Sequence, residues 1–169
     1  MLTIAATREV AEEPRVGLTP DIAKKYIGKG CGVVVETGAG ARSRFTDQDF
    51  AAVGAKIATS AAAALEGADV VLRVRRPLTG EIGLLKTGAV LAAILEPYQD
   101  RDGLEAIASR GVTAFAMELM PRITRAQSMD VLSSQSNLAG YKAVVDAAAE
   151  FDRALPMMMT AAGTVPAAK

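Results

Sequence analysis

The chain has 169 residues, of which half are hydrophobic and 4% aromatic, and its 19 basic residues balance 19 acidic ones. This length suits one domain with a sizeable core. The balanced charge argues against nucleic acid as a partner. One cysteine and no histidine exclude an internal disulfide, and no metal site is expected. No apolar run nears the roughly 18 residues that cross a membrane, so we expect a cytosolic protein without direct membrane insertion.

Apolar, β-branched runs alternate with helical patterns along the first 120 residues. Strands are predicted at residues 2–7, 31–36, 56–57, 68–74, 89–95 and 112–119. Helices are predicted at residues 20–30, around Phe50, at 60–66, as a short turn at 84–86, and at 102–110. Elements that alternate in this way form right-handed βαβ units. The sequence therefore predicts an α/β fold with a parallel, doubly wound sheet of the flavodoxin-like or Rossmann-like kind and helices on both faces.

Several helix ends carry residues that satisfy free backbone groups. Thr19, Thr46 and Ser60 stand where N-caps are expected, and Pro20 occupies a first helical position. Gly30 is placed to end the first helix. These positions fix where the predicted helices begin and end.

A long helix is predicted at roughly Ser134 to Leu155. Its apolar residues recur three and four apart, at Leu138, Tyr141, Val145, Ala148, Phe151 and Leu155. Such a stripe predicts that one face packs on a core. The tail that follows loses this periodicity and ends in small residues and Pro166. We therefore interpret residues 1–155 as one domain and residues 156–169 as a tether.

Two short motifs favour structure over ligand binding. Gly38 and Gly40 follow a strand, but a dinucleotide fingerprint needs a third glycine where Ser43 stands, and the next N-cap, Thr46, comes later. A structural turn is favoured, and the chain has no complete dinucleotide-binding unit of its own. The three methionines at 157–159 are interpreted as packing residues, since thioethers alone make a poor metal site.

Four arginines are expected at the carboxyl edge of the sheet, where open α/β sheets bind ligands. Arg15 follows the first strand, and Arg73, Arg75 and Arg76 end another. Arg73 and Arg75 share a face by the two-residue period and could clamp a carboxylate or phosphate. A solvated run of charges is the alternative, and the sequence leaves both open.

A second polar cluster follows the strand that Pro121 ends. It contains Arg122, Thr124, Arg125, Gln127, Ser128, Asp130, Ser133 and Ser134. These groups include cationic forks, amides, hydroxyls and a carboxylate, which together can hold a polar ligand by charge-assisted hydrogen bonds. The alternative is an ordinary solvated loop.

The same stretch carries a family resemblance. PRITRAQSMDVLSSQSNLAGY, followed by MMMTAAGTVP, resembles the N-terminal region of the NAD(H)-binding alpha subunit of proton-translocating NAD(P) transhydrogenase. Alanine dehydrogenase has a related N-terminal domain without the RAQSMD and SSQSNLAGY blocks. The resemblance implies hydride transfer from NADH to NADP, coupled to proton movement through separate membrane subunits.

The resemblance also implies roles for four residues. Arg122, Asp130 and Ser133 match positions that contact the nicotinamide end of NAD(H), and Gln127 matches one that reaches toward NADP(H) held by a partner subunit. Gln127 and Asp130 are the residues to which a catalytic role is assigned. Direct hydride transfer needs two rings held close together and neither an acid nor a base, so positioning groups of these types suit it.

Partners and location follow from the same resemblance. It implies a homodimer of alpha subunits that binds NADP(H)-binding and membrane subunits and lies on the cytoplasmic face of the inner membrane through them. The tether would lead to a Rossmann domain carrying the fingerprint that holds NAD, so the isolated chain is expected to be inactive.

Two alternatives remain. One is a non-catalytic, dimerising α/β module in which residues 120–133 contact protein. The other is an oxidoreductase like alanine dehydrogenase, in which an Arg, a Lys and a His hold and protonate pyruvate at positions that match Arg15, Arg75 and Glu96. Arginine keeps its proton near neutral pH, and glutamate replaces the histidine suited to this task. Oxidation of an amino acid is therefore disfavoured.

Overall fold

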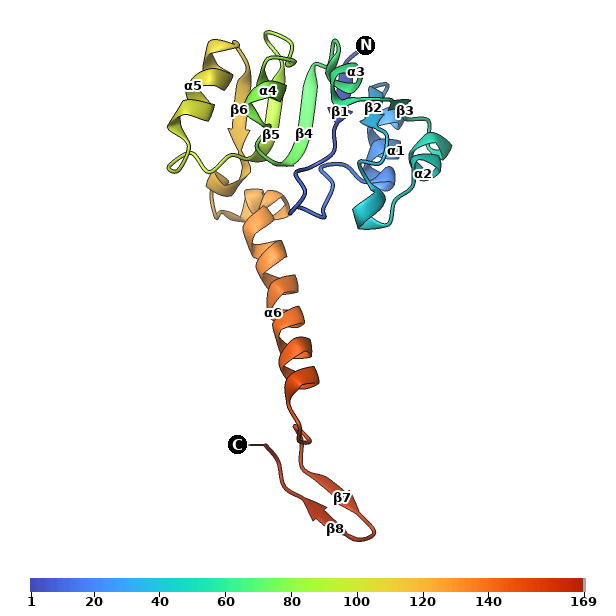
Figure 1. The fold of residues 1–169 in the computed structure, drawn as a ribbon, viewed down its shortest axis with the longest axis vertical. Helices are drawn as coiled ribbons and strands as arrows, with labels where there is room; N and C mark the ends of the chain where they lie inside the picture. Colours follow the sequence, from blue (N-terminus) through green and yellow to red (C-terminus); the bar gives the residue numbers. More distant parts are fainter. Residues whose placement is uncertain (169) are drawn as a thin grey trace. The chain divides into compact units, whose positions relative to one another are not determined.

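The computed structural model describes residues 1–168, which form two compact units (Figure 1). The first unit is Met1–Pro121, and the second begins at Arg122. The sequence predicted a different division, a domain of residues 1–155 followed by a tether of residues 156–169. That division stays a prediction.

The first unit is built on a six-stranded parallel sheet with the strand order β3-β2-β1-β4-β5-β6. The strands are β1 (Thr3–Ala6), β2 (Gly32–Glu36), β3 (Lys56–Ala58), β4 (Val70–Arg75), β5 (Val90–Ile94) and β6 (Thr113–Ala116). From β1 the chain adds β2 and β3 on one side, and it then crosses to the other side of β1 and adds β4, β5 and β6. This is the order of a doubly wound Rossmann-like sheet, so the predicted fold class is confirmed.

Helices cover both faces of this sheet. They are α1 (Pro20–Gly28), α2 (Asp47–Ala52), α3 (Ala61–Leu65), α4 (Thr79–Ile82) and α5 (Arg101–Ser109). Ala5 and Ala6 are neighbours in β1, yet they belong to different apolar clusters, because successive side chains of a strand point to opposite faces. Leu65 and Ile107 belong to the cluster around Ala5, and Phe50 belongs to the cluster around Ala6.

One half of one face is less covered than the rest. Leu91 and Ala93 of β5 are buried in the cluster around Ala5, whereas Ala92 between them is half-buried. Ala92 pairs in register with Phe115 of β6, whose side chain is 54% exposed. A parallel sheet is normally covered on both faces, and α1 to α5 leave this part of it open.

Two predicted N-caps are confirmed. Thr46 Oγ1 accepts a hydrogen bond from the Asp49 amide (3.2 Å) while Asp49 Oδ2 accepts one from the Thr46 amide (2.6 Å), a reciprocal capping box. Ser60 Oγ accepts from the Ala63 amide at 3.2 Å. Thr19 stands at the N-cap of α1 without a side-chain capping bond, and Pro20 follows it.

Two predicted elements were placed wrongly. The short helix lies at Thr79–Ile82 instead of 84–86, because Glu81 accepts the Leu78 amide at 2.8 Å and starts the turn earlier. The last strand ends at Ala116 instead of 119, and a 3₁₀ turn, η2 (Met117–Leu119), follows it. Glu118 in that turn accepts the Leu95 amide at 2.9 Å, so its side chain binds the end of β5.

The second unit contains a 3₁₀ segment, a long helix and a hairpin. They are η3 (Thr124–Met129), α6 (Val131–Glu150) and the antiparallel pair β7 (Met158–Thr160) and β8 (Gly163–Val165). The long helix begins before the predicted Ser134, because Asp130 caps it, and ends before the predicted Leu155, since Phe151 is already extended. The expected tether thus contains a hairpin. No helix within residues 1–168 is long and apolar enough to span a bilayer.

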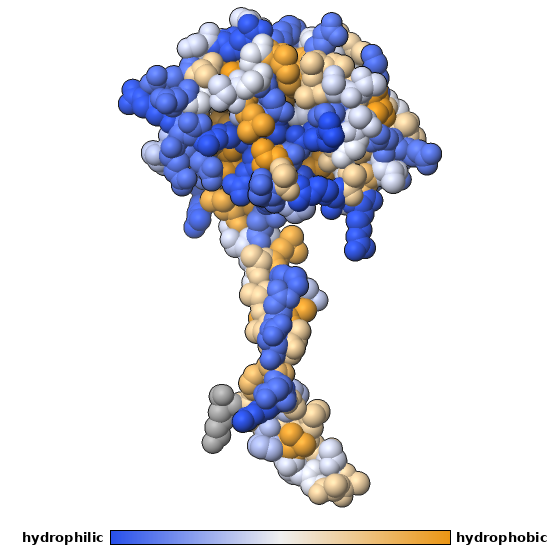
Figure 2. Space-filling view, in the orientation of Figure 1, coloured by the Kyte–Doolittle hydropathy of each residue, from blue (hydrophilic) through white to orange (hydrophobic). Residues whose placement is uncertain are grey.

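The expectation that one face of α6 packs on a core is not met within the described residues. No residue of α6 is buried, and Tyr141 is 72% exposed. Met159 is 82% exposed, so the methionine run does not pack either. One helix and a two-stranded hairpin offer no opposing layer. Figure 2 shows apolar residues along α6 beside a strip of hydrophilic ones.

The glycine turn after β2 has a packing role. Gly38 adopts a φ of 74° and its amide donates to Asp47 Oδ1 at 2.8 Å. Gly40 has an ordinary φ of −90°, but a Cβ there would lie 2.8 Å from both the Phe45 Cβ and the Phe50 ring. The space at Gly40 is therefore filled by two aromatic side chains.

Replacing Gly40 by alanine should reduce the free energy of unfolding by roughly 1–3 kcal/mol, because overpacking displaces Phe45 and Phe50. Gly28→Ala is the control, since a Cβ there meets nothing within 4 Å. It should change stability by no more than about 1 kcal/mol. Urea unfolding followed by circular dichroism measures both, and equal midpoints would contradict this account of the turn.

Candidate functional site

Six polar side chains of the second unit surround an open hollow of about 560 Å³. They are Arg122, Gln127, Asp130, Ser133, Ser134 and Asn137. All four residues predicted to bind the cofactor are among them. Arg122 precedes η3 and Gln127 lies within it, whereas the rest come from the start of α6. The structure adds Asn137, which sequence reasoning missed, although its place four residues after Ser133 puts both on one helix face.

Asp130 is held firmly at the beginning of α6. Its Oδ1 accepts hydrogen bonds from the amides of Leu132 (3.1 Å) and Ser133 (2.9 Å), and its Oδ2 accepts one from the Ser133 hydroxyl at 2.6 Å. The Ser134 hydroxyl donates to the Asp130 carbonyl oxygen. This is an N-cap in which a carboxylate also meets the positive end of the helix dipole.

The same hydrogen bonds lower the pKa of Asp130. The Ser133 hydroxyl is the largest cause, the backbone amides add to it, and the positive charge of Arg122 contributes least. A lowered pKa keeps the carboxylate ionised at neutral pH. The hollow therefore contains one fixed negative charge beside one arginine.

The other polar residues predicted for this loop do not line the hollow. Arg125 and Ser128 are exposed elsewhere on η3. A 3₁₀ helix has three residues per turn, so these two share a side that differs from that of Gln127. Thr124 is also exposed and lies outside the lining.

A second charged cluster lies at the carboxyl edge of the sheet in the first unit. Arg15 binds Glu13 in a fork, with Nε to Oε1 and Nη2 to Oε2 both at 2.6 Å. Arg75 reaches the same carboxylate, with Nε 3.2 Å from Oε2, and its Nη1 lies 3.4 Å from Glu96 Oε1. Of the four arginines expected to meet at this edge, Arg15 and Arg75 share the carboxylate of Glu13, which sequence reasoning did not single out, and Arg75 also reaches Glu96.

Glu13 is the centre of that cluster. Its side chain is only 5% exposed, and the hydrogen bond from Arg15 is the main reason that its pKa falls from 4.5 to about 2. The only sequence signal for this role was its position two residues before Arg15 in the loop after β1.

Arg73 and Arg75 do not clamp one anion, which was one of the two interpretations that the sequence left open. The pairing of β4 with β5 shifts in register between Leu72 and Arg75, which breaks the two-residue period. Arg73 binds Glu81 at 2.6 Å and Glu9 at 3.5 Å, and its side chain is 2% exposed. It is therefore a buried structural cation and not a member of a solvated run.

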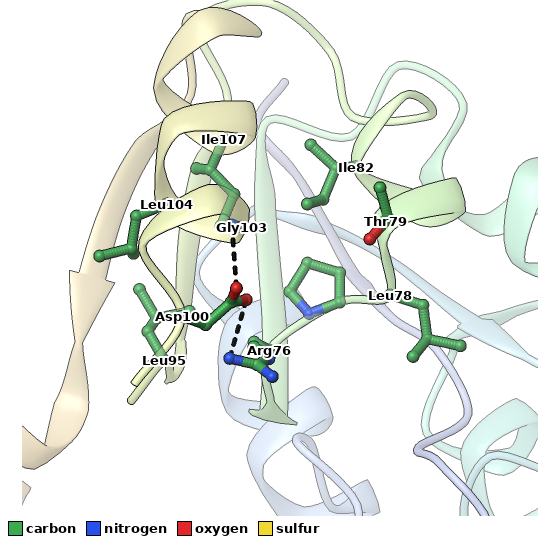
Figure 3. Close-up of a pocket in the computed structure, with 10 residues that line it drawn as sticks. Arg76, Leu78, Thr79, Ile82, Leu95, Asp100, Gly103, Leu104 and Ile107 are labelled. Atoms are coloured by element: carbon green, nitrogen blue, oxygen red, sulfur yellow. Dashed lines mark hydrogen bonds and ion pairs between the residues drawn. The ribbon is translucent and has the colours of Figure 1, made fainter. Parts of the chain in front are cut away.

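Arg76 lines a separate pocket of about 200 Å³ (Figure 3). Its Nη1 lies 2.8 Å from Asp100 Oδ2, and Asp100 also accepts the Gly103 amide at 3.1 Å to cap α5. Ile82 and Ile107 contribute apolar walls. The polar groups that Figure 3 draws are mostly bonded to one another, so this pocket is a weaker candidate than the hollow.

Known proteins resemble this chain along most of its length. The family described as alanine dehydrogenase/PNT, N-terminal domain, matches residues 5–139. The chain belongs to this family. Its relatives include an NAD(P) transhydrogenase alpha subunit of Rhodospirillum rubrum, which is 57% identical over 162 residues, covering 93% of this chain and 42% of the relative.

Within this family, the transhydrogenases are more similar to the chain than the alanine dehydrogenases. A solved structure of transhydrogenase from Sinorhizobium meliloti matches with a TM-score of 0.91 and 55% identity over 99% of this chain and 50% of that one. The alanine dehydrogenase of Halomonas elongata is 30% identical over 90% of this chain and 41% of the relative. The chain thus spans about half the length of these relatives, or somewhat less.

Replacing Glu13 by glutamine should destabilise the first unit at neutral pH by roughly 1–3 kcal/mol. Because the folded pKa is depressed, the stabilisation by the carboxylate is fully present above about pH 4.5 and is lost as the pH falls toward about 2. The difference from wild type should therefore shrink over that range. Glu12→Gln, at an exposed neighbour, is the control, and a pH-independent difference in urea unfolding would contradict the assignment.

Proposed function

We propose that this chain is the N-terminal region of the NAD(H)-binding subunit of a proton-translocating NAD(P) transhydrogenase. In this proposal the hollow of the second unit positions the nicotinamide of NAD(H) for direct hydride transfer to NADP. The observation that carries it is the convergence of Arg122, Gln127, Asp130 and Ser133 around one hollow. The 57% identity to the Rhodospirillum rubrum subunit supports the choice of reaction.

The lining residues have the chemistry that positioning requires. A nicotinamide supplies the hydride, and its carboxamide offers one acceptor and two donors. Arg122 can donate to the carboxamide oxygen, while Asp130 and Ser133 offer acceptor oxygens for its amino group. Groups that hold the ring in one orientation place its C4 atom toward the second nicotinamide, which is the main requirement of direct transfer.

The charge of Asp130 has a further consequence for the reaction. The nicotinamide ring becomes a cation when NADH gives up its hydride. An ionised carboxylate fixed in place by three hydrogen bonds stabilises that developing positive charge without reorganising. This is the basis for assigning a catalytic role to Asp130, whereas Gln127 is assigned the contact toward NADP(H).

Partners and location belong to the same proposal. The subunit forms a homodimer, binds a partner subunit that holds NADP(H), and lies on the cytoplasmic face of the inner membrane through membrane subunits. A second domain, corresponding to the half of its relatives that the chain does not span, supplies the glycine-rich fingerprint for NAD. Proton translocation belongs to the assembled complex, and the chain by itself is inactive.

One observation favours each alternative. The convergence of Arg15, Arg75 and Glu96 suits a site like that of alanine dehydrogenase. Glu13 and Glu96 together already balance the charges of the two arginines, however, and Glu96 lacks the chemistry of histidine. The exposed apolar residues of α6, such as Leu138 and Tyr141, suit a dimerising module that binds protein instead of nucleotide.

The isolated chain should bind NADH far more weakly than a subunit extended by the second domain, because most of the surface that holds a dinucleotide lies in that domain. Fluorescence titration with NADH measures both. The longer subunit is expected to saturate, while the 169-residue chain should not saturate at micromolar concentrations. Micromolar binding by the short chain would contradict the expectation that the second domain supplies most of the affinity for NADH.

Replacing Asp130 by asparagine in the full-length subunit should slow hydride transfer by roughly 10- to 100-fold, since the fixed negative charge is lost. The helix content should not change, because asparagine caps a helix as well as aspartate does. Stopped-flow transfer rates and circular dichroism test the two statements. An unchanged rate with intact folding would instead favour the non-catalytic module.

A further inference from the structure

Asn137 is the one residue of the hollow that lies beyond the first turn of α6. It comes one turn after Ser133, and its side chain lines the same hollow. Asn137 is exposed, and its side-chain amide makes no hydrogen bond within residues 1–168. Its two donors and its acceptor are therefore available to a ligand.

The capping bonds decide which neighbouring groups remain available. Asp130 Oδ1 already accepts two amides and Oδ2 accepts a hydroxyl. The Ser133 hydroxyl has its hydrogen committed to Asp130, and that of Ser134 donates to the Asp130 carbonyl oxygen. These three residues can still accept hydrogen bonds, but none has a side-chain donor left.

Two amides in the lining keep both a donor and an acceptor, those of Gln127 and Asn137. The proposed function directs Gln127 toward the second cofactor. Asn137 is then the group whose hydrogen-bonding pattern complements a primary carboxamide, since two primary amides pair through one N–H to O bond in each direction. Arg122 alone cannot pair with a carboxamide in both directions, because a guanidinium only donates hydrogen bonds.

We propose that Asn137 binds the nicotinamide carboxamide through its side-chain amide and fixes the rotation of that group. The inference rests on the proposed function and adds a cofactor-binding residue to it. It adds to the contacts already proposed, because a carboxamide has two N–H groups and two oxygen lone pairs: Arg122 and the acceptors of Asp130 and Ser133 bind one of each, and Asn137 pairs with the other. A ligand without the nicotinamide ring gains nothing from Asn137.

Calorimetric titration of the full-length subunit with NADH and with ADP-ribose tests this. Asn137→Ala should weaken NADH binding by about 5- to 30-fold, the loss of one to two hydrogen bonds, and leave ADP-ribose binding unchanged. Ser136→Ala is the matched control, because Ser136 is the preceding residue of α6 and does not belong to the lining. Unchanged NADH binding by Asn137→Ala overturns the inference, as does an equal loss for both ligands.

Asn137→Asp gives a second, independent measure. Aspartate keeps an acceptor for the carboxamide amino group of NADH. It repels deamido-NADH, in which a carboxylate replaces the carboxamide. Because it loses the donor to the carboxamide oxygen, this variant should weaken NADH binding by about 5-fold, and it should weaken deamido-NADH binding at least about tenfold further. Equal weakening of both cofactors overturns the proposed pairing.

Failure of this inference is distinguishable from failure of the proposed function. If Arg122→Ala and Ser133→Ala weaken NADH binding while Asn137→Ala does not, only the role of Asn137 falls. If all three variants bind NADH like wild type, the hollow is not the nicotinamide site and both proposals fall together.

Discussion

The first unit depends on a parallel sheet whose central strand is covered on both faces. Ala5 and Ala6 of β1 point into different apolar clusters, so the central strand is buried from both sides and brings two layers of helices together. The strand order places the carboxyl ends of β1 and β4 side by side, at the point where the direction of strand addition reverses. Open α/β sheets bind ligands at such a point. In this chain it is occupied by Glu9 and Glu13 with their arginine partners.

Carboxylates fix several of the loops that the structure describes. Glu81 starts α4, Glu118 binds the end of β5, and Asp100 and Asp130 cap α5 and α6. In each case a side chain accepts backbone amides that a helix or strand end would otherwise leave without partners.

The hollow of the second unit is a product of one of these caps. Asp130 caps α6, on which Ser133 and Asn137 share a face because they are four residues apart. Arg122, which precedes η3, and Gln127, which lies within it, reach the same hollow. The groups that fix the backbone are the ones whose donors are used up. Asp130 and Ser133 keep acceptors, and an arginine and two amides supply the donors, which suits a neutral, planar carboxamide better than a small anion.

The sequence by itself determined the fold class, the helix caps at Thr46 and Ser60, and a polar cluster in one stretch of chain, from which the family resemblance selected the four residues that line the hollow. These depend on local periodicity, on capping chemistry and on one contiguous stretch of chain, all of which can be read along the sequence. Only the tertiary structure decided the role of Glu13 and the separation of Arg73 from Arg75, because both depend on how β4 pairs with its neighbours and where the loop after β1 lies. It also decided that α6 carries its apolar stripe exposed in this chain. An apolar stripe in the sequence shows that a helix has an apolar face. It does not show which other element, if any, packs against that face.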